Sequence, residues 1–392
     1  MTSVTATTVT QGPANFIRHY ASQYCSNCQY DHNDLSQHLA SDHLDTILNG
    51  SVRSAFSQHQ HPAFDKSRYK YYDPVVDSDY TENQTWKQVK DGYDQANILE
   101  WAVQACPTSK IQHYLPQLIP PTLLILDDYD ITYKIRGVHI LQEIINKISD
   151  EGNVPSPSAT TTKTTSSQSS AVLGRGGVDN VLIDTLFKCL TYLSDDSHHP
   201  LLRAAYPCLM DLICKTKPAR SKERAQLFEK IMVNGILLGL KLGNYTVTLR
   251  EILLEQLSRV YLELGVLGVQ YLKVTIAALC DALTVPAVQL NRVALKSLQT
   301  LIHVCWPRIP GCHGIIIKGL ATSWKYYYSD GNSSGKNSAT NQQEQEMCNL
   351  IKETFKVYRS ACKGTENADL DALLLYNRSL YAPLVGQQDI SL

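Results

Sequence analysis

Two cysteines and two histidines near the start of the chain have the residue types and order of a zinc-binding motif. Cys25 and Cys28 are followed by His38 and His43, which gives the pattern C-x2-C-x9-H-x4-H. Thiolate and imidazole are the ligands of tetrahedral structural zinc sites. The gap between the second cysteine and the first histidine is nine residues, however, whereas zinc fingers use about 12. The spacing favours an ordinary helix at about 34–48 with surface histidines, and zinc is the alternative.

No other grouping of residues indicates catalysis. The sequence lacks H-E-x-x-H and G-x-x-x-x-G-K-[ST], and no Ser/His/Asp or Cys/His grouping has supporting context. We therefore expect no catalytic residues, no cofactor and no enzymatic activity.

Charge and cysteine usage narrow the class of protein further. The 392 residues carry 36 basic and 37 acidic side chains, so the chain lacks the surplus of Lys and Arg that nucleic-acid and membrane-surface binding use. We expect no direct contact with either. Many of the 11 cysteines lie in apolar stretches, as thiols do in a reducing compartment. With no signal-peptide pattern at the start, the expected location is cytoplasmic and nuclear.

Composition divides the chain into helical stretches and low-complexity segments. Apolar residues recur at helical spacing in the middle of the chain, and Ser, Thr, Gly, Gln and Asn dominate the segments between. Pro116, Pro120 and Pro121 are expected to prevent a single helix over 111–126. The expected divisions are a disordered N-terminus (1–14), a partly helical region (15–94), a helical repeat region (95–328) with a disordered insert (151–178), a disordered linker (329–343) and C-terminal helices (344–392).

Four segments share a layout in which a polar break precedes a helix with an early arginine. They are 127–141, 195–209, 243–257 and 284–298. Their arginines, Arg136, Arg203, Arg250 and Arg292, are 67, 47 and 42 residues apart, and subtracting the 28-residue insert from the first separation leaves 39. HEAT and armadillo repeats have a period of about 40–47 residues, and each helix pair covers the apolar stripe of its neighbour. We predict an all-α, HEAT/armadillo-like α-solenoid with disordered inserts, and a non-repeating bundle is the alternative.

The acidic run at 127–130 and a glycine within the following helix are informative. Carboxylates before a helix accept hydrogen bonds from its first N–H groups, so we favour capping over a partner contact. Gly137 lies in mid-helix, where glycine costs about 1 kcal/mol relative to alanine. We expect a neighbouring helix to approach closely there.

A tryptophan marks the predicted end of a later helix, in the run Cys305-Trp306-Pro307-Arg308. A large aromatic side chain at such a place is most often part of the core. If it were exposed, it would be a candidate interface hot spot. We expect Trp306 in the core.

These strings resemble the signature of the Tti-two family, a subunit of the Triple T (TTT) co-chaperone complex. They are LIPP at 118–121, LDDY at 126–129, YK at 133–134, RG at 136–137, YPCL at 206–209 and CWPRI at 305–309. The resemblance covers roughly 95–328, and DDY-x3-YK-x-RG is its most specific part. The candidate structural or partner-binding positions are Asp127, Asp128, Tyr129, Lys134, Arg136, Gly137, Trp306, Pro307 and Arg308.

The resemblance implies a non-enzymatic helical-repeat scaffold. Such a protein binds the other two Triple T subunits, themselves helical-repeat proteins. Together with the heat-shock chaperone system it supports the folding, stability and assembly of phosphatidylinositol-3-kinase-related kinases, which act in telomere, DNA-damage and TOR signalling. Two other hypotheses stay open: a HEAT-repeat adaptor of the transport or phosphatase type, and a zinc-dependent nucleic-acid binder built on Cys25 and Cys28.

Overall fold

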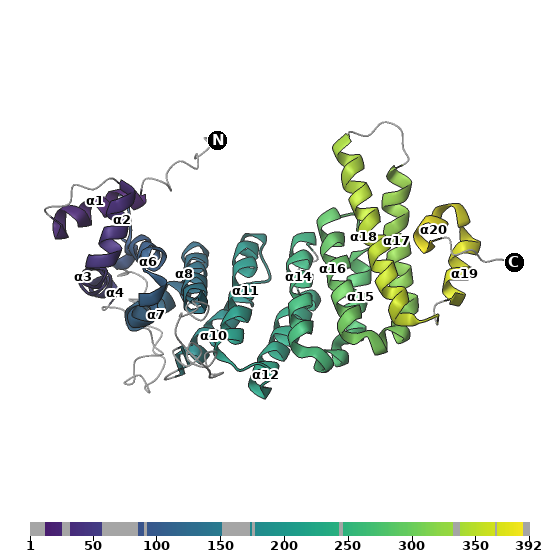
Figure 1. The fold of residues 1–392 in the computed structure, drawn as a ribbon, viewed down its shortest axis with the longest axis horizontal. Helices are drawn as coiled ribbons and strands as arrows, with labels where there is room; N and C mark the ends of the chain where they lie inside the picture. The colour runs from purple at the N-terminus through teal and green to yellow at the C-terminus, as the bar shows by residue number, and fades with distance from the viewer. Residues whose placement is uncertain are drawn as a thin grey trace, which may run out of the picture. The chain divides into compact units, whose positions relative to one another are not determined.

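The computed structural model describes residues 12–25, 32–56, 85–89, 92–150, 173–174, 177–242, 246–331, 338–364 and 367–386. Within these residues the regular secondary structure is helical and no strand is present, which confirms the all-α class (Figure 1). The chain forms two compact units, one of residues 1–189 and 203–218, the other of residues 190–202 and 219–392.

The first unit begins with short helical segments and continues with longer helices. In it α7 packs along α8, and α6 contacts both. Its elements are α1 (Gly12–Tyr24), α2 (His32–His38), the π-helix η1 (Leu39–His43), α3 (Leu44–Ile47), the π-helix η2 (Leu48–Val52), α4 (Arg53–Phe56), the 3₁₀ turn η4 (Thr85–Lys87), α6 (Gln95–Ala105), the 3₁₀ turn η5 (Thr108–Lys110), α7 (Ile111–Leu126), α8 (Ile131–Asp150), α10 (Val178–Cys189) and most of α11 (His199–Thr216).

Helix α7 runs through all three of its prolines, so the prediction that they prevent a single helix was wrong. Each proline removes the N–H that would bond the carbonyl four residues earlier. Those carbonyls belong to Gln112, Pro116 and Gln117, and these three residues are half-buried or exposed. The lost hydrogen bonds therefore lie on the more exposed side of the helix, where water can reach the carbonyl groups. The opposite face buries Leu115, Leu118 and others.

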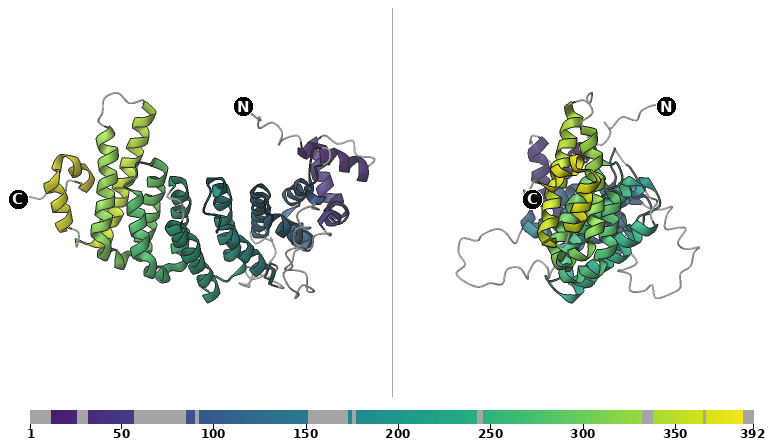
Figure 2. Two further views of the ribbon diagram at one scale, coloured as in Figure 1. Left: turned by 180° about the vertical axis from the view of Figure 1, so that it is seen from behind. Right: turned by 90° about the vertical axis from the view of Figure 1, so that its right-hand side faces the viewer.

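The second unit contains the remaining helices. Next-but-one neighbours pack together, α14 on α16 and α16 on α18, as well as α15 on α17, and Figure 2 shows α14, α16 and α18 side by side. Its elements are η8 (Asp196–His198), α12 (Lys222–Lys230), the π-helix η9 (Ile231–Leu237), α13 (Leu238–Leu242), α14 (Val247–Leu264), the 3₁₀-helix η10 (Gly265–Tyr271), α15 (Leu272–Ala282), α16 (Val288–Cys305), the 3₁₀-helix η11 (Trp306–Cys312), α17 (His313–Gly331), α18 (Ser338–Cys362), α19 (Asn367–Tyr376) and α20 (Arg378–Val385).

The four similar segments each lead into a long helix, α8, α11, α14 and α16, of 18 to 20 residues. The matched arginines fall within the first two turns of these helices. Two of the other polar breaks supply caps, because the Asp195 side chain accepts the Ser197 N–H in η8, just before α11, and the Thr246 side chain accepts the Leu249 N–H, whereas α16 begins without a side-chain cap. The shared layout of a polar break followed by a helix is therefore confirmed.

Helix extends into two of the segments that we expected to be disordered. Helix α17 continues to Gly331 and α18 begins at Ser338, so helix occupies both ends of the expected linker. Leu173 is helical and buried, within the expected insert. The rest of the insert (151–172 and 175–176), the middle of the linker (332–337) and residues 1–11 lie outside the described residues.

One stretch of the described residues, Val247–Ala282, is long and apolar enough by length and composition to cross a membrane. It is not one straight helix, because Gly265 at φ +52° ends α14 and begins the 3₁₀-helix η10. Helices α14 and α15 both pack on α16. The arrangement is that of core helices within the second unit.

Candidate functional site

The turn between α7 and α8 is built around a buried ion pair. Asp128 is 4% exposed, and both of its carboxylate oxygens lie 2.7 Å from Lys87 Nζ. Asp128 Oδ1 also accepts the Asp130 backbone N–H at 2.7 Å, and Asp130 Oδ1 accepts the Thr132 N–H at 2.8 Å. The predicted capping by this acidic run is confirmed. Asp127 is half-buried, 3.6 Å from Lys188.

Aromatic rings surround the ammonium group of Lys87. Its Nζ lies 4.2 Å from the Tyr129 ring centroid, 5.0 Å from that of Tyr133 and 5.2 Å from that of Trp86. Trp86 is buried and stacks on Phe56. The negative ring faces complement the cation, so Asp128 and the rings stabilise Lys87 together. Tyr129 is 67% exposed and closes this group at the surface.

Asp94 connects the signature residues of α8 to the start of α6. Its Oδ2 accepts the Tyr133 hydroxyl at 2.8 Å and Arg136 Nη1 at 3.2 Å. Asp94 also forms a capping box with Asn97, in which each side chain accepts the backbone N–H of the other. Burial, followed by the hydrogen bond to Asp94, raises the pKa of Tyr133. Arg136 Nη2 reaches Glu100 at 3.4 Å, so the pair Tyr133 and Arg136 joins two helices.

Lys134 and Gly137 fix α8 against the end of α7. Lys134 is 5% exposed, and its Nζ donates to the Leu126 carbonyl oxygen at 2.9 Å. This carbonyl lies in the last turn of α7, where the helix dipole favours a cation. A Cβ added to Gly137 would lie 3.1 Å or less from backbone atoms of Ile125 and Leu126. The close approach expected from Gly137 is confirmed.

The signature residues at 128–137 therefore meet in one place, where they join α6, α7 and α8. Their charged groups are engaged in ion pairs and caps and do not line an open cleft. Sequence reasoning missed Lys87 and Asp94, which are 41 and 39 residues from their partners Asp128 and Tyr133. No spacing rule links residues that far apart. Tyr129 is the exposed part of the cluster.

The string CWPRI at 305–309 lies in the second unit, where α16 ends and η11 begins. Trp306 is 53% exposed, so the prediction that it lies in the core was wrong. Helix α16 ends at buried Cys305, and the 3₁₀-helix η11 then redirects the chain so that Ile309 faces the core. Pro307 and Arg308 are also exposed. Lys363 Nζ lies 5.5 Å from the Trp306 ring centroid.

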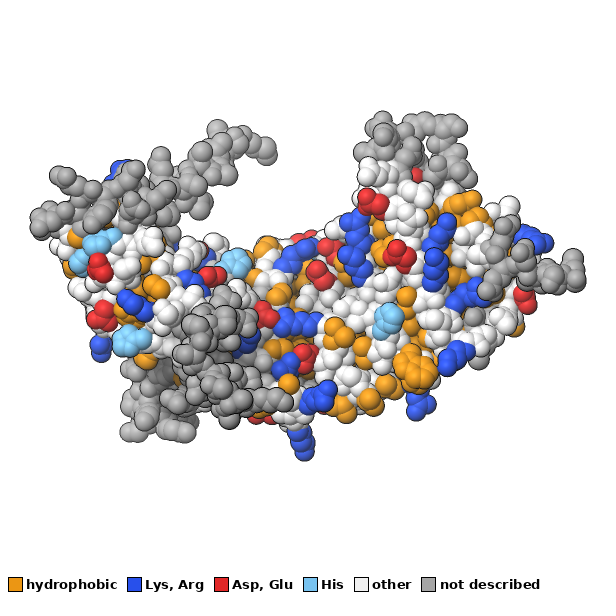
Figure 3. Space-filling view, viewed as in Figure 1, with side chains coloured by type: hydrophobic (Ala, Val, Ile, Leu, Met, Phe, Trp, Pro, Cys, Tyr) orange, Lys and Arg blue, Asp and Glu red, His pale blue; other side chains and the backbone are white. Residues whose placement is uncertain are grey.

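Exposed apolar side chains also occur at the corner formed by η10. Val266 is 85% exposed and Leu267 55% exposed. Helix α16 contacts η10 and leads directly into η11. Figure 3 shows hydrophobic side chains reaching the surface among Lys and Arg side chains on one face. We call Val266, Leu267, Trp306 and Arg308 the corner surface.

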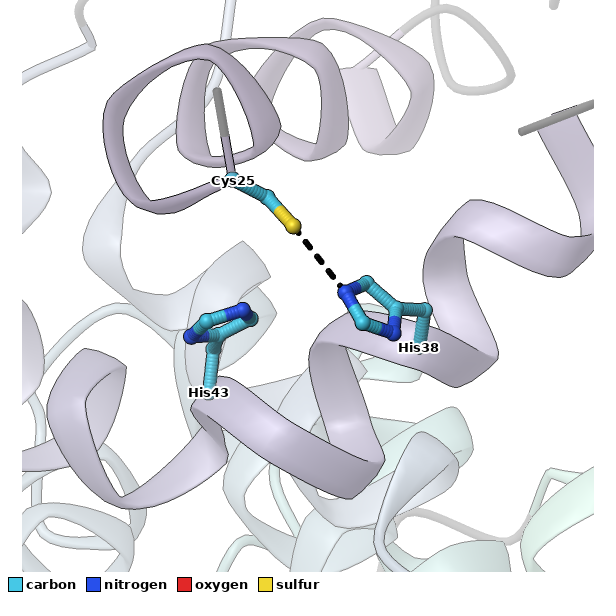
Figure 4. Close-up of side chains that lie close together, drawn as sticks. All are labelled: Cys25, His38 and His43. Atoms are coloured by element: carbon cyan, nitrogen blue, oxygen red, sulfur yellow. Dashed lines mark hydrogen bonds between the residues drawn. The ribbon is translucent and has the colours of Figure 1, made fainter. Parts of the chain in front are cut away.

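Cys25, His38 and His43 lie together in the first unit (Figure 4). Their ligand atoms are all within 4.8 Å of one another, and Cys25 Sγ is 3.0 Å from His38 Nε2. All three residues are half-buried, and His43 ends a π-helix. The expected helical stretch at about 34–48 is present, as α2, η1, α3 and the start of η2, but it contains π-helical turns and its histidines are half-buried, so the expectation of an ordinary helix with surface histidines was only partly right. Cys25 is disulfide-bonded in this structure. Cys28 lies outside the described residues.

A literal G-x-S-x-G string occupies 331–335. A catalytic serine of that motif stands between a strand and a helix. Here the string follows α17, and the described part of the chain contains no strand. The match gives no support to a hydrolase.

The fold and the signature turn define an all-α protein whose helices are joined by buried polar contacts at their ends. A model of the Tti2 family matches residues 5–290, and the chain belongs to this family. The match includes the turn between α7 and α8 and the Cys–His cluster, and ends before Trp306. The family predicted from the sequence is thereby confirmed.

Two curated proteins are similar in sequence to this chain. TELO2-interacting protein 2 of Rattus norvegicus is 26% identical over 247 residues, which cover 60% of this chain and 42% of that protein. TELO2-interacting protein 2 of Mus musculus is 26% identical over 249 residues, with the same shares. The chain thus spans less than half the length of the curated relatives it matches. No solved structure matches.

Proposed function

We propose that this chain is a non-enzymatic scaffold that binds a TELO2-type partner as a subunit of a Triple T co-chaperone complex. The observation that carries the proposal is the family match, which covers the signature turn. Two relatives have names that describe an interaction with TELO2. In this role the chain acts in the cytoplasm and nucleus and supports phosphatidylinositol-3-kinase-related kinases indirectly, through the complex and the heat-shock chaperone system.

The packing of the second unit supports a scaffold with HEAT-like architecture. Contacts between next-but-one helices, such as α14 with α16 and α15 with α17, are those of two layers of stacked helix pairs. Stacked pairs bury their apolar stripes against one another and leave the connecting corners free. A solenoid of this kind offers surface for partners without a catalytic cleft.

The signature turn supports the same role by its chemistry. Asp128 and Lys134 are buried and Lys87 is half-buried, and all three are engaged in an ion pair or a helix-end hydrogen bond, so none is placed to transfer a proton to a bound substrate. Groups of this kind hold helices in register, which preserves the shape of a binding surface.

The corner surface is the place where we expect a partner to bind. Its exposed apolar side chains together with an arginine resemble the composition of protein interfaces. Trp306 is the expected hot spot, because tryptophan buries a large area with few rotatable bonds. A second helical-repeat protein is the expected partner.

Affinity purification tests the proposal. The tagged full chain, expressed in cells of its own source, should recover two helical-repeat proteins, one of them the TELO2 counterpart. Trp306→Ala should reduce recovery about 30-fold, because a hot spot contributes about 2 kcal/mol or more. Tyr376→Ala is the matched control, since Tyr376 is 76% exposed on α19. Recovery of the chain without either helical-repeat protein would overturn the proposal, and equal losses in both variants would remove the corner surface from it.

A further inference from the structure

We propose that the chain, once its Cys25 disulfide is reduced, binds a zinc ion between Cys25, His38 and His43. The three side chains come from the end of α1, the end of α2 and the end of η1. One thiolate and two imidazoles are a ligand set that suits zinc and does not suit calcium or magnesium, which prefer oxygen. The proposal is independent of the partner-binding role.

The backbone brings the two histidines to one side of the chain. In an α-helix of 3.6 residues per turn, residues five apart point about 140° away from each other. Leu39–His43 is instead a π-helix, in which hydrogen bonds join residues i and i+5. The two imidazole ring centroids are 5.4 Å apart. Short π-helical turns occur frequently at functional sites, and this one places His38 beside His43.

Asp42 orients His38 for metal binding. Its Oδ2 lies 3.0 Å from His38 Nδ1, so that nitrogen carries the proton and donates. His38 Nε2 lies 3.0 Å from Cys25 Sγ, which makes it the nitrogen that would bind an ion placed between these two atoms. Metal-binding histidines commonly donate their other nitrogen to a carboxylate, which fixes the tautomer and raises the basicity of the ligand. The structure therefore supplies an outer partner as well as inner ligands.

The distances between the three ligand atoms are close to those around a single bound zinc ion. With Zn–S near 2.3 Å and Zn–N near 2.0–2.1 Å, ligand atoms around a tetrahedral zinc lie about 3.3–3.6 Å apart. The three ligand atoms here are all within 4.8 Å of one another, so small side-chain rotations suffice. Three protein ligands leave the fourth position to water or to a further ligand.

The oxidation state of Cys25 controls this site. A disulfide sulfur is not a thiolate and does not ligate zinc strongly. A reductant must first break the S–S bond and give two cysteine thiols. A dithiol supplies two electrons and two protons and becomes a disulfide, whereas a phosphine supplies two electrons and becomes a phosphine oxide, with water supplying the two protons and the oxygen. Zinc then displaces the proton of the Cys25 thiol and forms the Zn–S bond. The oxidised chain should therefore bind no zinc here.

Metal analysis of the purified full chain tests the proposal. The chain is reduced with a phosphine, loaded with Zn²⁺ and desalted, and zinc is measured by mass spectrometry. We expect about one zinc per reduced chain and less than about a tenth after oxidation with diamide, with zinc binding restored by a second reduction. Co²⁺ in place of zinc should give the absorption of a tetrahedral thiolate site. Reduced wild type with less than a tenth of an equivalent would overturn the proposal.

Substitutions of the proposed ligands test which residues bind the zinc ion. Cys25→Ser and His43→Asn should each lose the zinc, and Asp42→Asn should weaken binding about 10–100-fold. Cys214→Ser and His113→Asn are matched controls that should keep it, since Cys214 is a half-buried cysteine on α11 outside any disulfide and His113 is exposed on α7. Circular dichroism establishes that each variant is folded. A folded Cys25→Ser chain with as much zinc as wild type would contradict the assignment.

Discussion

Gly137 of α8 and Leu126 of α7 meet through their backbones. A Cβ on Gly137 would lie 2.7 Å from the Leu126 nitrogen and 2.8 Å from its Cα. Real Cβ atoms do not approach other atoms so closely, and backbone cannot rotate away as a flexible side chain can. Only glycine allows the two helices this separation.

Gly137→Ala should destabilise the chain, although alanine has the higher helix propensity. The propensity gain is about 1 kcal/mol, while the added methyl group forces α7 and α8 apart, and overpacking of this kind costs about 1–3 kcal/mol. We expect a net loss of stability in urea unfolding. Gly314→Ala is the control, because Gly314 is in α17 with no atom within 4 Å of its Cβ position. Gly314→Ala should leave the free energy of unfolding unchanged or raise it. If Gly137→Ala also left it unchanged or raised it, the packing argument would be contradicted.

Lys134→Met should also destabilise the chain. It keeps a long side chain but removes the donor that satisfies the Leu126 carbonyl at 2.9 Å. An unsatisfied buried acceptor costs about 1–3 kcal/mol. Lys188→Met serves as the comparison, because its ion pair with Asp127 is 3.6 Å long and the Lys188 side chain is 67% exposed, and surface pairs contribute about 0–1 kcal/mol. Similar effects of the two changes on urea unfolding would count against the assigned role of Lys134.

The free energy of unfolding should fall in alkaline solution, partly because the Tyr271 hydroxyl loses its proton there. Burial, followed by the hydrogen bond that its hydroxyl donates to Glu229 at 2.6 Å, raises its pKa to about 12 from 10.0. Since the folded chain holds the phenol proton more tightly, its contribution is complete below pH 10 and is lost as the pH rises from 10 to 12. Tyr271→Phe should show a shallower fall of the unfolding free energy over that range.

Glu229→Gln provides the matched comparison for Tyr271. It keeps a hydrogen-bond acceptor but removes the negative charge that opposes ionisation of the phenol. Its alkaline loss of stability should lie between those of wild type and Tyr271→Phe. If all three chains lost stability in parallel between pH 10 and 12, Tyr271 would not be a source of the effect.

Local signals explain what the sequence predicted well. The starts of η8, which leads into α11, and of α14 depend on a capping side chain, Asp195 or Thr246, and on apolar spacing within the next few turns. Gly137 is informative for the same reason, since glycine in mid-helix is unfavourable unless another backbone is near. The helices, their caps and one close contact could thus be inferred from short stretches of sequence.

The features that sequence did not indicate depend on distant parts of the chain. Lys87 pairs with Asp128 across 41 residues. The exposure of Trp306 follows from the turn of η11, which places Ile309 inside. The π-helix that brings His38 and His43 together has no sequence signal of its own, and in a regular helix the same two histidines would diverge.

The three prolines of α7 have a consequence for what this helix can touch. The carbonyl oxygens of Gln112, Pro116 and Gln117 lack the amide four residues later that a regular helix supplies. The side of α7 that carries these residues therefore offers backbone acceptors that a regular helix would satisfy within itself. Arginine, lysine or amide side chains of a neighbour suit these carbonyl groups, because each can donate the hydrogen bond that the proline cannot.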